Sequence, residues 1–212
     1  MEVCTIESMP FAENSYVIHH GDRTDAIVVD PGFEPDRILR VLKNRGLTLA
    51  AILCTHGHVD HIVGNAALKE MYPDAPLVIG IGDAAALTDA RLNLSGYFGP
   101  ALTSPPADRT VTAGEVIEYA GIRMEVLEIP GHSPGHVVFL VRDEPPVVFG
   151  GDVLFAGSIG RTDFPGGSLE QLLGGIREKL WPLPDATIVY PGHGEPTTIG
   201  DEKATNPFLT GG

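Results

Sequence analysis

Three imidazoles and one carboxylate are concentrated in one short segment, Thr55–His61 (THGHVDH). The segment follows a short apolar stretch and precedes a helical pattern, so its side chains are expected to project from a loop at the end of a buried strand. Residues two apart in extended backbone point to the same side, which predicts that His56 and His58 lie together. Asp60 and His61 fall where the helix begins and are placed to serve a second position nearby. Neutral imidazole and carboxylate are good ligands for zinc and other divalent first-row metals.

Three later segments also place a histidine or aspartate at the end of a predicted strand. His132 lies in GHSPGH, Asp152 follows Val147–Phe149 in the triplet GGD, and His193 follows Ile188–Tyr190 in PGHG. The flanking glycines allow tight turns and close approach of the backbone. A lone histidine is more often a surface or core residue, but a complete set with this spacing predicts a metal site. The predicted ligands are His56, His58, Asp60, His61, His132, Asp152 and His193.

The remaining histidines and the cysteines have other predicted roles. His136 follows His132 by four residues and is expected to support a ligand rather than bind metal. His19 and His20 stand at a strand end and are interpreted as surface residues. Ser133 is interpreted as a turn hydroxyl. Cys4 and Cys54 lie in apolar stretches, which predicts two small buried side chains and no disulfide framework.

Composition places the chain among ordinary globular proteins. It has 212 residues, 43% of them hydrophobic and 20% charged, which predicts a single domain spanning residues 1–212. The formal net charge of −14 makes nucleic acid a poor partner, because nothing offsets phosphate repulsion. We find no secretory leader and no apolar stretch of membrane-spanning length, so we expect a cytoplasmic protein that does not bind membranes.

The order of predicted elements is mixed. Early strands precede a region where strands and helices alternate, a pattern that two sheets covered by helices would accommodate, in the α/β or α+β class. Pro35 is expected to open a helix that Gly46 ends, His61–Met71 and Asp83–Ala90 to be helical, and Ser168 to cap a helix that reaches Leu180. The expected strands are Val3–Ile6, Ser15–His19, Ala26–Val29, Ala50–Cys54, Leu77–Ile79, Glu115–Tyr119, Arg123–Ile129, Val137–Val141, Val147–Phe149 and, as the last, Ile188–Tyr190; Asn93–Ala107 is expected to be loop.

The motifs THGHVDH, GHSPGH, GGD and PGHG, in this order, resemble the metallo-β-lactamase superfamily. Gly150–Gly166 and Tyr190–Leu209 are similar to the short bacterial glyoxalase II-like branch, whose type activity is hydroxyacylglutathione hydrolysis. The resemblance implies an αββα sandwich of two mixed β-sheets flanked by helices. It also implies a first metal on His56, His58 and His132 and a second on Asp60, His61 and His193. Asp152 would bridge the two, and Asp60 and Asp152 are the candidate catalytic residues.

The resemblance implies a binuclear hydrolase that cleaves a small-molecule thioester, such as S-D-lactoylglutathione, through a hydroxide shared by the two metals. Zinc is the favoured metal, with iron or manganese as alternatives. A monomer or small homo-oligomer is expected. Full-length glyoxalase II carries a C-terminal domain that supplies cations for glutathione, and the chain offers little positive charge after His193. Arg161 is a candidate for a substrate carboxylate, although pairing with Asp163 is the simpler interpretation.

Two alternatives remain open from the sequence. A mononuclear iron persulfide dioxygenase would use His56, His132 and Asp152, and that family shares the segment Gly160–Phe164. A non-catalytic metal-binding module is disfavoured because every ligand position is filled. Cleavage of RNA or DNA is disfavoured by the net negative charge.

Overall fold

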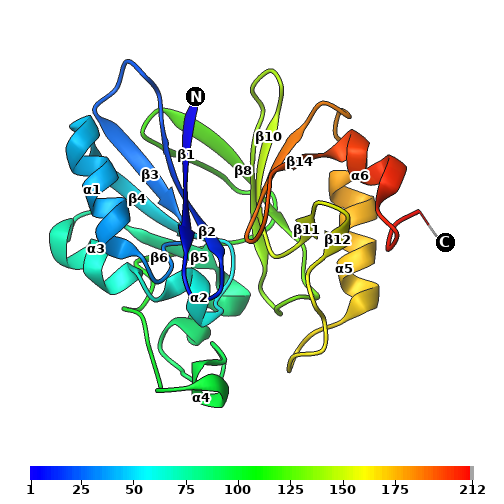
Figure 1. Cartoon of the computed structure of the whole chain (residues 1–212), viewed down its shortest axis with the longest axis horizontal. Helices are drawn as coiled ribbons and strands as arrows, with labels where there is room; N and C mark the ends of the chain where they lie inside the picture. Colours follow the sequence, from blue (N-terminus) through cyan, green and yellow to red (C-terminus); the bar gives the residue numbers. More distant parts are fainter. Residues whose placement is uncertain (211–212) are drawn as a thin grey trace.

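Two six-stranded β-sheets form the centre of the computed structural model, which describes residues 1–210 (Figure 1). The first sheet has the order β1-β2-β3-β4-β5-β6. Its first three strands are antiparallel, and β3 to β6 are parallel. The bounds are β1 Glu2–Ser8, β2 Glu13–His19, β3 Asp25–Val29, β4 Thr48–Cys54, β5 Leu77–Gly80 and β6 Arg109–Val111.

The second sheet has the order β14-β13-β10-β9-β8-β7. All its neighbours are antiparallel except β10 and β13, which run in parallel. A separate pair of two-residue strands, β11 and β12, follows β10. The bounds are β7 Val116–Tyr119, β8 Ile122–Glu128, β9 Val137–Val141, β10 Val147–Gly151, β11 Leu154–Phe155, β12 Ser158–Ile159, β13 Ile188–Pro191 and β14 Thr197–Thr198.

Helices cover the outer face of each sheet, so the layers are helix, sheet, sheet, helix. Helices α1 (Pro35–Arg45) and α3 (Asn65–Met71) flank the first sheet, and α5 (Leu169–Gly175), its π-helical continuation η2 (Ile176–Leu180) and α6 (Ile199–Thr205) flank the second (Figure 1). Three apolar clusters fill the space between successive layers. The central cluster joins the sheets through side chains such as Phe139 and Phe149, both fully buried. The predicted αββα sandwich of two mixed sheets is therefore confirmed.

Local sequence explains several element ends. Pro35 occupies the first turn of α1, where a backbone N–H has no partner in the helix, and Gly46 ends the helix at a φ of 65°. The hydroxyl of Ser168 accepts a hydrogen bond from the backbone N–H of Gln171 and caps α5. Both boundaries agree with the sequence prediction, because they depend on contacts within a few residues.

The predicted helix His61–Met71 is wrong in its continuity. The chain forms α2 (Val59–Ile62), breaks, and resumes as α3. The backbone N–H of Gly64 donates to the carbonyl of Pro31 at 2.8 Å, and a Cβ at Gly64 would lie 2.6 Å from the carbonyl oxygen of Gly32. This close approach to a distant loop ends the first helical segment, and no local pattern reports it.

Other elements also differ from the prediction. The segment predicted as helix Asp83–Ala90 is the 3₁₀ helix η1 (Ile81–Leu87), and the predicted loop Asn93–Ala107 contains the single turn α4 (Ser95–Phe98). Strand β13 is not the last, since β14 and α6 follow it. His19 is buried rather than exposed, because Nη1 of Arg45 lies 3.0 Å from its Nε2 and covers it together with Glu2.

Within residues 1–210, none of the helices combines the length and the apolar character that crossing a bilayer requires.

Candidate metal centre

The seven predicted ligands come from loops and from the short helix α2 at one edge of the sandwich. His56 and His58 follow β4, Asp60 and His61 lie in α2, and His132 lies between β8 and β9. Asp152 follows β10 and His193 follows β13. Strands β10 and β13 are parallel neighbours, so their carboxyl ends meet at this edge. The backbone N–H of Asn14 donates to the carbonyl of Gly192 at 2.7 Å, which ties the β13 loop to the first sheet.

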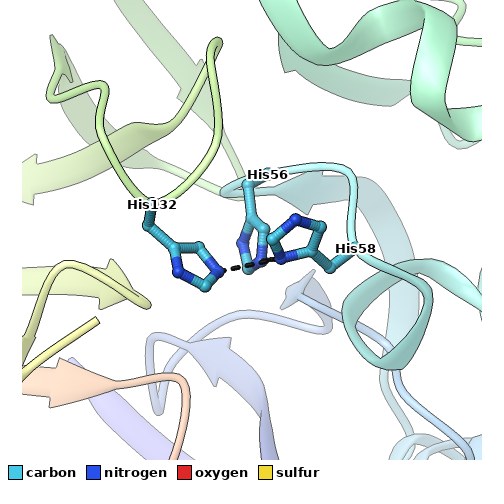
Figure 2. A group of neighbouring side chains, drawn as sticks. All are labelled: His56, His58 and His132. Atoms are coloured by element: carbon cyan, nitrogen blue, oxygen red, sulfur yellow. Dashed lines mark hydrogen bonds between the residues drawn. The ribbon is translucent and has the colours of Figure 1, made fainter. Parts of the chain in front are cut away.

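The first group consists of His56, His58 and His132, whose rings converge in Figure 2. Nδ1 of His58 lies 3.0 Å from Nε2 of His56 and 2.8 Å from Nε2 of His132. Two nitrogens bound to one tetrahedral zinc lie about 3.3 Å apart, given zinc–nitrogen bonds of about 2.0–2.1 Å. The three nitrogens therefore have nearly the spacing of a metal trio.

Hydrogen bonds orient the rings of this group. Nδ1 of His132 lies 2.8 Å from the carbonyl oxygen of Arg161, so this nitrogen donates and Nε2 keeps its lone pair toward the other rings. The hydroxyl of Thr55 lies 3.1 Å from Nδ1 of His56. The nitrogens that face the centre are thus the ones free to accept a metal.

The second group consists of Asp60, His61 and His193. Oδ2 of Asp60 lies 3.5 Å from Nε2 of His193 and 3.8 Å from Nε2 of His61. Nδ1 of His193 lies 3.1 Å from the carbonyl oxygen of Phe11, which leaves its Nε2 facing the group. The structure thus brings the residues of each predicted trio together.

Asp152 lies between the two groups. Its Oδ2 is 3.3 Å from Nε2 of His132 and 3.6 Å from Nε2 of His193. Its Oδ1 is 3.5 Å from Nε2 of His61. One carboxylate therefore reaches nitrogens of both groups, which is the position that a bridging ligand requires.

Two buried atoms of this cluster have no hydrogen-bond partner among the described residues, namely Nε2 of His61 and Oδ1 of Asp152. An unpaired polar atom in the interior is costly, and nearly all such atoms in folded proteins are satisfied. Both atoms face the second group. Metal coordination would satisfy them, so the donor set fits divalent ions.

Burial and charge keep His56, His58 and Asp60 in the protonation states that bind metal, whereas His61 is held protonated. Burial lowers the pKa of His58 to about 3 and lowers the pKa of His56 well below its usual value, so both rings are neutral. Burial alone would raise the pKa of Asp60, but His61 and His193 lower it overall and keep the carboxylate charged. Burial alone would lower the pKa of His61, but Asp60 and Asp152 raise it, so metal binding there must displace a proton.

Asp30 is a functional candidate that the sequence prediction missed. Its Oδ1 accepts the backbone N–H of Thr55 and its Oδ2 accepts the Thr55 hydroxyl, both at 2.7 Å. The same Oδ2 lies 3.2 Å from Nδ1 of His61. Asp30 also lies close enough to His56 and His61 to form a group with them, but these bonds already occupy its oxygens. Asp30 therefore orients His61, and its place at the end of β3 was the available signal.

His136 and Asp83 hold the metal-binding loops in place. His136 is fully buried and stacks on His56, with ring centroids 4.7 Å apart, and its Nε2 accepts the backbone N–H of Asp152. The carboxylate of Asp83 accepts bonds from the backbone N–H groups of Gly57 and Gly135 and from the hydroxyl of Ser133 at 2.6 Å. Asp83 thus joins the loop of His56 to the loop of His132, and Ser133 is more than a turn hydroxyl.

A cavity of about 290 Å³ opens beside the cluster. Its walls include the apolar side chains of Phe11, Val59, Leu94 and Phe164, and among the described residues Arg161 is the arginine that lines it. Arg161 forms two hydrogen bonds of 2.7 Å to the carboxylate of Asp163, and its guanidinium lies 3.9 Å from the ring centroid of Phe164. The simpler interpretation of Arg161 therefore agrees with the structure.

Comparisons of sequence give relatives over nearly the whole chain. The family model described as the metallo-beta-lactamase superfamily matches residues 9–193. The probable metallo-hydrolase YqgX of Bacillus subtilis is 41% identical over 203 residues, covering 95% of this chain and 94% of the relative. The hydroxyacylglutathione hydrolase GloC of Haemophilus influenzae is 39% identical over 212 residues, covering 99% and 98%.

Comparisons of structure give the same fold. BLEG-1, described as a B3 metallo-beta-lactamase, superposes with a TM-score of 0.94 at 39% identity, covering 99% of this chain and all of that one. TTHA1623 in a di-iron-bound form superposes with a TM-score of 0.86 at 37% identity, covering 98% of this chain and 100% of that one. ETHE1 from Myxococcus xanthus superposes with a TM-score of 0.82 at 30% identity, covering 100% of this chain and 85% of that one.

Proposed function

The chain belongs to the metallo-β-lactamase superfamily, and we propose that it is a binuclear metal-dependent hydrolase of thioesters. The observation that carries this proposal is the position of Asp152 between two complete donor groups. His56, His58 and His132 would hold the first ion, and Asp60, His61 and His193 the second. The similarity to probable metallo-hydrolases supports a hydrolase, and the similarity to GloC supports a hydroxyacyl thioester as substrate.

Zinc is the metal we propose, because imidazole and carboxylate suit it and the first group has nearly its tetrahedral spacing. The di-iron form of TTHA1623 makes iron the alternative. Divalent ions supply Lewis-acid polarisation of a carbonyl and lower the pKa of water toward neutrality. The protein contributes the orientation of its donors, which Asp30 and the carbonyl of Arg161 fix through the outer ring nitrogens.

The residues of the cavity favour a thioester over an ester or amide. Its carboxylates, Asp60 and Asp152, both face histidines of the cluster and are therefore not free to protonate a leaving group. A thiolate leaves without a strong general acid, whereas an alkoxide or an amine needs one. The apolar walls of Phe11, Val59 and Leu94 would exclude bulk water from the scissile bond.

β-Lactams are a second candidate substrate class, because BLEG-1 is as similar to this chain as GloC is. A mononuclear iron dioxygenase acting on persulfides is a further alternative, which would use only His56, His132 and Asp152. The three activities differ in what they consume and release, so one set of assays separates them.

The test uses the purified protein in two forms: one loaded with zinc and assayed without oxygen, and one as isolated, with its metal content measured, assayed in aerated buffer. We expect release of free thiol from S-lactoylglutathione or from lactoylpantetheine, a smaller neutral thioester, without oxygen uptake. A chromogenic cephalosporin and glutathione persulfide serve as the competing substrates. Hydrolysis of the cephalosporin alone would move the function to β-lactams. Stoichiometric oxygen uptake with the persulfide, together with one iron per chain, would overturn the hydrolase.

A further inference from the structure

We infer that Arg91 binds an anionic group of the thiol carrier in a subsite adjoining the metal cavity. This inference rests on the proposed thioesterase function and adds the class of carrier, namely a thiol that bears carboxylate or phosphate groups. It depends on a second cavity, on the distribution of positive charge around the site, and on the anchoring of the loop that carries Arg91.

A second cavity of about 140 Å³ lies next to the metal cavity and shares His58 and Leu94 with it. Arg91 and Tyr97 line this second cavity together with apolar residues such as Leu92 and Pro134. Because the two cavities are adjacent, a substrate whose thioester carbonyl lies at the metal centre would place one of its arms past His58 in the second cavity. An arm of peptide or pantetheine type would extend toward Arg91.

The two arginines that line these cavities differ in how their charge is compensated. Arg161 is paired with Asp163 through both of its hydrogen bonds, so a substrate anion would have to displace that carboxylate. The guanidinium of Arg91 has no ion pair among residues 1–210, and its side chain is exposed. The carboxylate of Asp83 in the same cavity is occupied by its bonds to Gly57, Ser133 and Gly135. Arg91 is therefore the cation that is free for a ligand.

The loop that carries Arg91 is fixed to the metal centre. The carboxylate of Asp89 accepts the backbone N–H of Arg91 at 2.8 Å. Two residues further on, the carbonyl of Asn93 accepts the backbone N–H of Val59 at 3.0 Å, and Val59 lies between two predicted ligands. The side chain of Asn93 also donates to the carbonyl of Leu102. Because the loop is held this way, the backbone of Arg91 has a fixed place relative to the metal centre.

The experiment compares three thioesters of the same lactoyl group, carried by glutathione, by coenzyme A and by the uncharged pantetheine. Arg91→Ala should raise KM for the anionic substrates relative to the pantetheine substrate by about three- to tenfold, as expected for an exposed charge-assisted contact. In the wild type, KM for the anionic substrates should rise with salt, and Arg91→Ala should lose that dependence. Arg91→Lys should keep most of the salt dependence of KM. A response with glutathione alone indicates a carboxylate ligand, and a response with coenzyme A alone indicates phosphate.

The matched control is Arg177→Ala, which removes an exposed arginine that lines neither cavity and should leave the ratio of KM values for the anionic and uncharged substrates within about twofold. If this control changes the ratio and Arg91→Ala does not, the assignment of Arg91 is wrong. Binding of S-methylglutathione and S-methylpantetheine, measured by calorimetry, gives a reading without turnover. Loss of affinity for S-methylglutathione in Arg91→Ala supports the subsite even if no thioester is hydrolysed. Such a lack of hydrolysis would count against the proposed function alone.

Discussion

Nε2 of His136 accepts the backbone N–H of Asp152 at 3.1 Å, so a residue outside both donor groups holds the carboxylate that lies between them. The ring of His136 also stacks on His56 at an interplanar angle of 17°. His136 thus contacts the first group and Asp152, and it is a positioning residue. A substitution that keeps the stacking and removes the acceptor separates these two contributions.

His136→Phe should retain the stack on His56 and leave the N–H of Asp152 without a partner. An unsatisfied buried donor costs about 1–3 kcal/mol, and loss of such a supporting contact typically weakens metal binding about 10–100-fold. Competition against a chromogenic chelator measures the affinity for zinc. Circular dichroism checks that the variant is folded. Affinity equal to that of the wild type would show that His136 only fills space.

Asp152→Ala should lose both ions, because Asp152 is the one predicted ligand that reaches both groups. Elemental analysis of the folded variant should give less than one metal per chain. The matched control is Asp163→Ala, which removes an exposed carboxylate paired with Arg161 and should keep two metals. Two metals per chain in Asp152→Ala would refute the bridging role.

Asp30→Asn should weaken the binding of the second metal ion more than that of the first. Its carboxylate bonds to Thr55 and lies 3.2 Å from Nδ1 of His61, which belongs to the second group. The amide cannot accept from His61 and from both Thr55 groups at once, so the ring of His61 loses its orientation. We expect a loss of about 10–100-fold in affinity for the second equivalent of zinc, measured by calorimetry. An equal loss of affinity for both equivalents of zinc would show that the substitution disturbs the whole site and does not act through His61.

Glu13→Gln should change how stability depends on pH. Burial raises the pKa of Glu13 well above 4.5, so this carboxyl stays neutral in the folded protein at pH values where it ionises in the unfolded chain. Its stabilising contribution is complete below pH 4.5 and is lost as pH rises through the folded pKa. The free energy of unfolding of metal-free Glu13→Gln, minus that of the wild type, should therefore increase with pH above 4.5.

Urea denaturation at several pH values between 4 and 8 measures this difference. Ser15→Ala is the control, because its hydroxyl donates to Glu13 but does not titrate in this range. A difference between Glu13→Gln and the wild type that stays constant with pH would show that Glu13 is charged in the folded state.

The sequence predicted the parts of the site that local spacing determines. His56, His58, Asp60 and His61 lie in one segment, and the glycines beside His132, Asp152 and His193 mark loops at strand ends. The role of Asp30 was not predicted, because its partners Thr55 and His61 are distant in sequence. The pairing of β3 with β4 brings them into contact with Asp30. The burial of His19 has the same origin, since Arg45 covers it from α1.

The fold shows a similar division. The hairpin of β7 and β8 and the caps of α1 and α5 follow from neighbouring residues, and the sequence predicted them. The break at Gly64 depends on a carbonyl of another loop, Pro31, which sequence periodicity cannot report. Strand β6 has only three residues and a single buried one, Val111, so its alternation is too short to recognise.

The most direct test of the binuclear hydrolase is a zinc titration of metal-stripped protein, followed by the rate of thioester hydrolysis under anaerobic conditions. We predict that the rate rises to a plateau at two equivalents of zinc per chain, because Asp152 joins the two donor groups into one site. A plateau at one equivalent, or thioester hydrolysis at full rate in the stripped protein, would contradict it.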